Sequence, residues 1–97
     1  MKPVRFLEEA QEEFLAQVTY DEEQQKGLGG RFSQSVEMAT ALASAHPKSG
    51  SPWKLRTRRV SPKDFPFSIV YRIEPTEPVV FAIAHFRRRP TYWRHRR

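Results

Sequence analysis

The chain has 97 residues, of which 38% are hydrophobic and 29% are charged, and it contains no cysteine. This length accommodates one domain, so residues 1–97 are predicted to fold as a single unit, and the composition excludes intrinsic disorder. The missing cysteine excludes disulfides and favours the cytoplasm, three scattered histidines predict no metal or cofactor site, and the longest apolar run, Val79 to Ala84, is too short to cross a membrane.

The net charge of +6 is distributed unevenly along the chain. Residues 1–50 contain five Lys or Arg and eight Asp or Glu, whereas residues 51–97 contain twelve and three. This asymmetry predicts a polyanionic partner for the second half, either a nucleic acid or an acidic protein segment. A basic surface that only confers solubility is the alternative. Most of these cations are arginines, whose planar guanidinium group can bind phosphate or carboxylate with two hydrogen bonds.

A first helix is predicted from about Phe6 to Gln25. Four apolar residues recur at three- and four-residue spacing and therefore share one face: Leu7, Ala10, Phe14 and Val18. Four glutamates are expected to point away from that face into solvent: Glu8, Glu9, Glu12 and Glu13. Gly27 is expected to end the helix, because glycine accepts the left-handed conformation found there.

A second helix is predicted over residues 31–45, after a tight connection through the glycines at 29 and 30. Its apolar stripe consists of Leu28, Phe32, Val36, Ala39 and Ala43. His46 ends the helix, because the residue before a proline is disfavoured in helical geometry. Two helices joined by a glycine turn predict an antiparallel helical hairpin.

From residue 54 onward the hydrophobic period changes from that of a helix to that of a strand, which predicts strands at 54–60, 65–73 and 79–87. A short opening strand at 2–5 is an additional candidate. The strand at 79–87 is the most apolar and is expected in the centre of the sheet. The predicted fold is α+β: an N-terminal antiparallel helical hairpin packed on one face of an antiparallel sheet of three to four strands, followed by a basic C-terminal tail.

Alternation within the strands assigns side chains to opposite faces of the sheet. The first strand is predicted to carry a basic row on one face, with a further cation on the other: Lys54, Arg56 and Arg58, against Arg59. The last strand is predicted to place four residues on one face: Phe81, Ile83, His85 and Arg87. The main core between hairpin and sheet is predicted to contain Phe14, Phe32, Val36, Ile69, Tyr71, Phe81 and Ile83.

The C-terminal tail combines cations with aromatic rings, a pattern typical of surfaces that bind a nucleic-acid backbone and stack its bases. Alternatively, Tyr92 and Trp93 anchor the tail on the core, and one packed ring with one exposed ring satisfies both readings. His85 beside Arg87 pairs a group that titrates near neutrality with a cation for phosphate, although a histidine bound to the backbone is the alternative. The candidate target- or nucleic-acid-binding residues are Lys54, Arg56, Arg58, Arg59, Arg87, Arg88, Arg89, Trp93 and Arg94.

Five blocks occur in order along nearly the whole chain: Tyr20-Asp21-Glu22, Gly27-Leu28-Gly29-Gly30-Arg31-Phe32, Arg58-Arg59, Phe65-Pro66-Phe67-Ser68-Ile69-Val70-Tyr71, and Ala84-His85-Phe86-Arg87-Arg88-Arg89-Pro90-Thr91-Tyr92-Trp93. Together they closely resemble the RelE/ParE superfamily, the toxin halves of bacterial type II toxin–antitoxin systems. The resemblance implies a small α+β fold. It also implies a cognate antitoxin that wraps the toxin with an acidic segment, and therefore a toxin–antitoxin hetero-oligomer with no membrane partner.

The superfamily divides by mechanism. The glycine-rich and Phe-Pro-Phe blocks resemble the ParE-like branch more closely, which implies a toxin that inhibits DNA gyrase by binding rather than by catalysis. The alternative is a RelE-like endoribonuclease that cleaves ribosome-bound messenger RNA without a metal ion. The candidate catalytic residues for that activity are His85, Arg87 and Tyr92. The resemblance implies Arg87 and a C-terminal tyrosine at Tyr92 or Trp93, and His85 is added because it is predicted beside Arg87 on the last strand. A non-catalytic nucleic-acid-binding module is the third reading.

Overall fold

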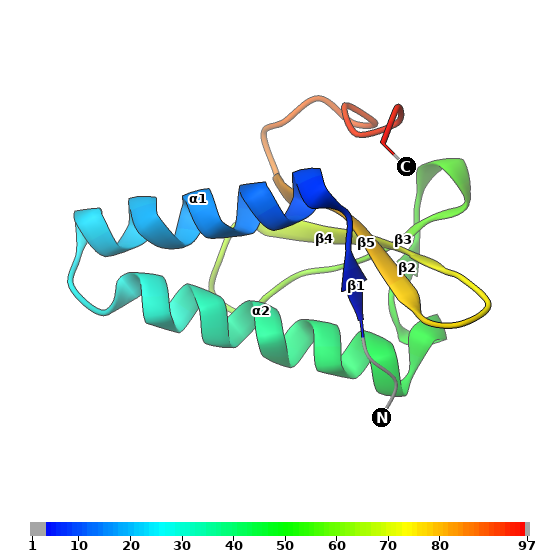
Figure 1. Cartoon of the computed structure of the whole chain (residues 1–97), viewed down its shortest axis with the longest axis horizontal. Helices are drawn as coiled ribbons and strands as arrows, with labels where there is room; N and C mark the ends of the chain where they lie inside the picture. Colours follow the sequence, from blue (N-terminus) through cyan, green and yellow to red (C-terminus); the bar gives the residue numbers. More distant parts are fainter. Residues whose placement is uncertain (1–3, 97) are drawn as a thin grey trace.

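The computed structural model describes residues 4–96 and has two antiparallel helices on one face of a five-stranded sheet (Figure 1). The helices are α1 (Glu8–Gln24) and α2 (Leu28–Ala45). The strands are β1 (Arg5–Phe6), β2 (Ser51–Pro52), β3 (Arg58–Val60), β4 (Phe67–Ile73) and β5 (Pro78–His85). Within residues 4–96, neither helix combines the length and the apolarity that crossing a membrane requires.

The strand order is β1-β5-β4-β3-β2, which confirms the predicted α+β class and adds a strand to the expected number. Strand β5 lies between β1 and β4, and seven of its eight residues are buried, as its apolar composition predicts. Every neighbouring pair is antiparallel except β1 and β5, which run parallel and pair Arg5 with Val79. An opening strand is present, but at Arg5–Phe6, so it shares only Arg5 with the predicted range 2–5. Val4 is not part of the strand, and residues 2 and 3 lie outside the described part.

The connection between the helices is shorter than predicted. Helix α1 ends before the predicted Gly27, at Gln24, with the extended Gln25 as its C-cap. Gly27 adopts a φ of 87°, the left-handed conformation that favours glycine, and lies directly before α2. Helix α2 begins directly afterwards, so the glycines at 29 and 30 lie in the helix and not in the turn. The reason is a carboxylate on α1: Glu22 accepts the backbone N–H groups of Gly27 at 2.9 Å and Gly29 at 3.1 Å, which satisfies donors at the start of α2.

The core has two layers, one on each face of the sheet. The layer between the sheet and the helices contains Ala10, Phe32, Val36, Ala39, Ala43, Phe67, Ile69, Tyr71, Val80 and Ile83. The layer on the opposite face contains Leu7, Val70, Val79, Phe81, Ala82, Ala84 and Trp93. Four residues of the predicted stripe of α2 and the predicted core positions Ile69 and Tyr71 of β4 are thus confirmed, while Leu28, the first residue of the stripe, is only partly buried. The C-terminal tail supplies a buried ring to the second layer.

Phe81 lies in the second layer, so its predicted position between hairpin and sheet is wrong. The register explains the difference: Val70 pairs with Ala82 and Tyr71 pairs with Val80, which leaves Phe81 as an extra residue in β5. Such a β-bulge interrupts strict alternation and places two consecutive residues on one face. Ile83 follows the bulge and faces the helices as predicted.

The predicted strand at 54–60 is restricted to its last three residues, Arg58–Val60. Leu55 and Arg56 have φ values of 60° and 61° and form a tight turn. The predicted row of Lys54, Arg56 and Arg58 on one face of a strand is therefore wrong. The turn is held from both sides. Thr57 Oγ1 donates to the Lys54 carbonyl at 2.7 Å, and Arg72, from β4, donates to the Leu55 carbonyl at 2.8 Å.

Candidate functional site

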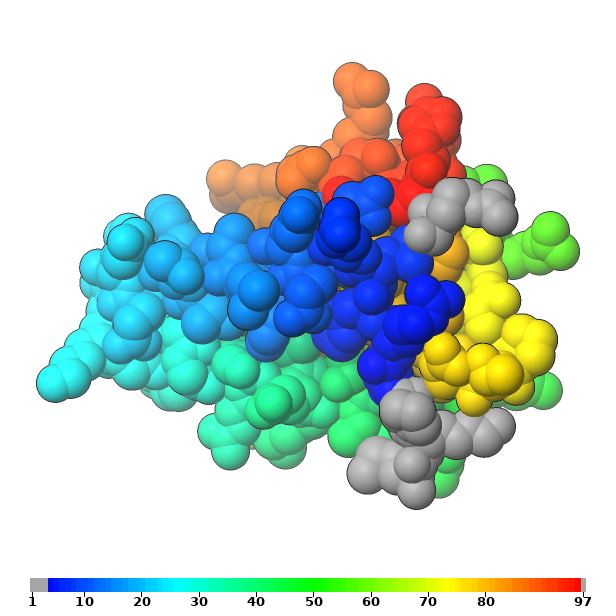
Figure 2. All heavy atoms as spheres, in the orientation of Figure 1, coloured from blue at the N-terminus to red at the C-terminus, as the bar shows by residue number. Residues whose placement is uncertain are grey.

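The predicted binding residues occupy two segments, whose aromatic residues Trp53, Tyr92 and Trp93 belong to the core layer on the side of the sheet away from the helices. One is the tail after β5, drawn orange to red above α1 in Figure 1. In the space-filling view the tail, orange to red, forms a ridge along one edge of the molecule above the blue α1 (Figure 2). The other segment is the turn and strand from Trp53 to Arg59. Residues of both segments line one small pocket.

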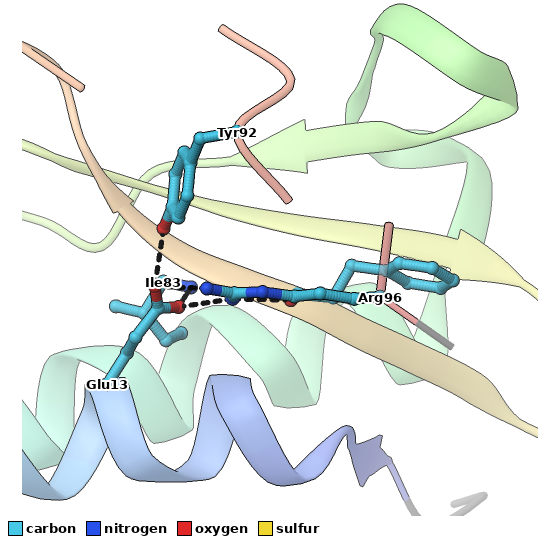
Figure 3. Close-up of polar contacts among 5 residues, drawn as sticks. Glu13, Ile83, Tyr92 and Arg96 are labelled. Atoms are coloured by element: carbon cyan, nitrogen blue, oxygen red, sulfur yellow. Dashed lines mark hydrogen bonds and ion pairs between the residues drawn. The ribbon is translucent and has the colours of Figure 1, made fainter. Parts of the chain in front are cut away.

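A carboxylate on α1 holds the tail in place (Figure 3). Glu13 accepts hydrogen bonds from the Tyr92 hydroxyl at 2.6 Å and from both terminal nitrogens of Arg96 at 2.8 and 2.9 Å. It also accepts the backbone N–H of Ile83 at 3.0 Å, and Arg96 donates to the Phe81 carbonyl at 3.1 Å. We call Glu13, Tyr92 and Arg96 the tail clamp.

The tail clamp corrects the prediction that Glu13 points into solvent. Strand β1 pairs with β5 only at Val79 and Val80, so the next part of this β5 edge lacks a neighbouring strand. Glu13 and Arg96 supply the acceptor and the donor that a strand would have provided. A signal was present in the sequence, because Glu13 follows Ala10 by three residues and therefore borders the apolar stripe of its helix.

The two aromatic residues of the tail are both anchored. Trp93 is 1% exposed and packs edge-on against Phe81, with ring centroids 6.3 Å apart. Its ring is therefore enclosed, and a surface role like the one predicted for it would require the tail to move. Tyr92 is partly buried, and Arg88 stacks over its ring at 3.8 Å. The anchoring alternative accounts for both rings, with Tyr92 the more accessible.

The tail clamp predicts how the stability of the protein depends on pH through the Tyr92 hydroxyl. Burial, the hydrogen bond to Glu13 and the charge of Glu13 raise the pKa of the Tyr92 hydroxyl well above its usual value near 10. Its contribution to stability is then fully present below about pH 10 and is lost as the pH rises through the folded-state pKa, because the unfolded chain ionises first. We expect the free energy of unfolding to fall more steeply between pH 9 and 11 in the wild type than in Tyr92→Phe, measured by urea denaturation. Equal slopes would contradict the clamp.

The remaining predicted residues of the tail are placed as follows. His85 ends β5, packs edge-on against Phe67 at 5.1 Å, and its Nδ1 accepts the backbone N–H of Arg87 at 3.0 Å. Four arginines of the tail are exposed: Arg87, Arg88, Arg89 and Arg94. His85 and Tyr92 line the same pocket together with Arg88, while Arg87 is not among its lining residues.

The predicted cations of the other segment differ in their surroundings. Arg58 donates to the backbone carbonyls of Lys48 at 3.2 Å and Gly50 at 2.7 Å, which ties it to the chain before β2. Arg59 stacks on Trp53 with its guanidinium carbon 3.6 Å from the ring centroid. Lys54 and Arg56 are exposed. Among residues 4–96, no group of three His, Asp or Glu side chains is arranged to hold a metal ion.

The sequence matches no family model and no curated protein. Among solved structures, the chain is similar to a chain of the "Chromosomal ParDE TA system from P. aeruginosa", with a TM-score of 0.74 and 17% identity. The match covers 88% of this chain and 96% of that chain. A likeness at this identity concerns the fold, and the fold of the present chain is accordingly ParE-like, as the sequence resemblance predicted.

Proposed function

We propose that this chain is the toxin of a type II toxin–antitoxin system, and that it arrests bacterial growth by binding DNA gyrase in the cytoplasm until a cognate antitoxin neutralises it. The observation that carries this proposal is the ParE-like fold, shared over 88% of the chain with a structure described as a ParDE system. The glycine-rich connection and the Phe-Pro-Phe block, which favoured the ParE-like branch, lie at the helix junction and at the start of β4.

Two side-chain contacts favour a binding protein over a RelE-like nuclease. The Tyr92 hydroxyl donates to Glu13, and its raised pKa makes it a poor source of phenolate. The Nδ1 atom of His85 accepts a backbone N–H, which leaves Nε2 as the single ring nitrogen for external contacts. Both groups therefore form hydrogen bonds within the protein, whereas general acid–base catalysis needs these groups to face a substrate.

The exposed cations of the tail and of the turn at Leu55 support an acidic antitoxin segment as the neutralising partner. Arg87, Arg89 and Arg94 follow β5, while Lys54 and Arg56 flank the turn, and all five residues are exposed. Positive surface charge attracts an acidic segment and accelerates its association. The toxin and antitoxin would then form a hetero-oligomer in which this surface is covered.

The target is tested by expressing the chain in bacteria and assaying the purified protein in two reactions. We expect growth arrest, inhibition of supercoiling by purified gyrase, and intact messenger RNA on ribosomes. Arg87→Ala should weaken gyrase inhibition about tenfold through lost affinity, since a hydrogen bond to a charged group contributes about that much. Arg31→Ala is the matched control, because Arg31 is an exposed arginine on α2.

A different set of results would favour the endoribonuclease. Ribosome-dependent cleavage of messenger RNA by the wild type, reduced about 10²–10³-fold by Arg87→Ala, would identify Arg87 as a group that stabilises a transition state. That outcome would replace the gyrase proposal with the RelE-like endoribonuclease. Failure of the wild type to affect growth, supercoiling and messenger RNA would reject both activities.

A further inference from the structure

The pocket shared by the tail and the segment from Trp53 to Arg59 has a composition that suits an anionic ligand. Its volume is about 200 Å³, and it lies against the face of β4 and β5 that the helices leave uncovered. Three arginines line it, Arg59, Arg88 and Arg89, and its lining includes neither aspartate nor glutamate. A cluster of three cations without a carboxylate attracts anions and repels cations.

Two of these arginines are held in a fixed orientation by aromatic rings. Arg59 stacks on Trp53 at 3.6 Å and Arg88 stacks on Tyr92 at 3.8 Å. Stacking uses the flat face of the guanidinium and leaves its N–H groups, which lie in its plane, free to bind an oxyanion. Within residues 4–96, neither arginine takes part in an ion pair.

A hydroxyl also lines the pocket. Ser68 contributes it from β4, and this residue is 7% exposed. A hydroxyl can donate one hydrogen bond to an oxygen of a ligand and accept another from water.

The size of the pocket and its aromatic walls narrow the class of ligand. About 200 Å³ is less than the ~300–1,000 Å³ of sites that enclose drug-sized molecules, so the pocket encloses only a compact part of its ligand. Each arginine offers up to about five N–H donors, more than one carboxylate can use, whereas a phosphate group presents several oxygens in different directions. Phe86, 58% exposed at the pocket, offers a face on which a planar ring can stack.

We propose that this pocket binds a single nucleotide unit. Arg59, Arg88 and Ser68 hold the phosphate, Arg89 adds charge at the entrance, and the base stacks on Phe86. A free nucleoside monophosphate and a single-stranded nucleic acid both supply such a unit, since both present a phosphate beside a planar base. This inference stands apart from the proposed gyrase target and requires no reaction at the site.

Binding is measurable through the protein's own fluorescence, because both tryptophans of the chain line the pocket. The purified protein is titrated with 5′-AMP, with adenosine, with a short oligoadenylate and with a polyglutamate peptide. We expect saturable changes with AMP or the oligoadenylate, competition by inorganic phosphate, and no saturation by adenosine at the same concentrations. Tighter binding of AMP assigns a free nucleotide as the source, and tighter binding of the oligoadenylate assigns a nucleic acid.

Matched variants locate the binding in the pocket. Arg59→Ala should weaken the affinity about 10- to 100-fold, and Arg59→Lys should restore only part of it, because lysine keeps the charge without the planar fork. Ser68→Ala removes one oxygen atom and should weaken binding about 2- to 10-fold without threatening the fold. Arg31→Ala should bind as the wild type does.

Three results would overturn the proposal. Adenosine could bind as tightly as AMP, which would show that the phosphate group does not contribute to binding. Ser68→Ala and Arg59→Lys could both bind AMP with unchanged affinity, which would place the ligand elsewhere. Saturable binding of polyglutamate with no response to AMP or the oligoadenylate would make the pocket a site for an acidic peptide.

Discussion

Replacing Phe32 by alanine is expected to lower the free energy of unfolding by about 3–5 kcal/mol, the range for truncating a buried phenylalanine. Phe32 is 0% exposed and its ring meets three others, with centroids 6.0 Å from Phe14, 5.1 Å from Phe65 and 5.3 Å from Phe67. It therefore joins both helices to the start of β4. A loss of this size approaches the whole stability of a typical small domain.

The measurement is urea denaturation followed by circular dichroism, with Phe86→Ala as the matched control. The same substitution at Phe86, which is 58% exposed, should change the free energy of unfolding by less than about 1 kcal/mol. If Phe32→Ala is too unstable to purify, Phe32→Leu should still fold and melt below the wild type. Equal stability of Phe32→Ala and the wild type would show that α2 presents a different face to the sheet.

Replacing Glu13 by alanine is expected to release the C-terminal tail and to cost about 2–4 kcal/mol. Removing one partner of a fully buried ion pair costs about 3–5 kcal/mol, and the value here is lower because the Glu13 and Arg96 side chains remain 19% and 16% exposed. The substitution leaves the Ile83 N–H without its acceptor and the Arg96 guanidinium with only the Phe81 carbonyl. Release of the tail should also expose Trp93.

Glu12→Ala is the control for this prediction, since Glu12 is the neighbouring glutamate on α1 and is exposed. We expect Glu13→Ala to shift tryptophan emission to longer wavelength and to accelerate trypsin cleavage within the arginine-rich tail, while Glu12→Ala does neither. Glu13→Gln should fall between them, because its amide oxygen can still accept one N–H but carries no charge. Identical tryptic patterns for Glu13→Ala and the wild type would contradict the clamp.

The candidate site was only partly accessible from the sequence. The basic composition of the second half and the arginines at 59, 88 and 89 are visible there, because charge is a property of single residues. Tyr92 was identified as an aromatic residue of the basic tail, but its contact with Arg88, the contact of Trp53 with Arg59 and the position of Ser68 were not. These contacts depend on the course of the tail, on the turn at Leu55 and on the position of β4 in the sheet.

What the sequence by itself determined is the set of elements with strong local signals. The spacing of Phe32, Val36 and Ala39 specifies the buried face of α2, the left-handed conformation at Gly27 allows the tight turn between the helices, and the apolar run in β5 makes it an interior strand. Each of these features arises from residues within a few positions of one another, where periodicity and backbone preference act directly.

Only the tertiary structure decided the role of Glu13, the face of Phe81 and the turn at Leu55. Glu13 meets Arg96 across 83 positions of sequence, because a short β1 leaves part of the β5 edge in need of hydrogen-bond partners. Phe81 changes face because the register between β4 and β5 contains a bulge. In each case the outcome depends on which backbone groups remain unpaired after distant segments meet, and buried backbone groups must find partners wherever the fold supplies them.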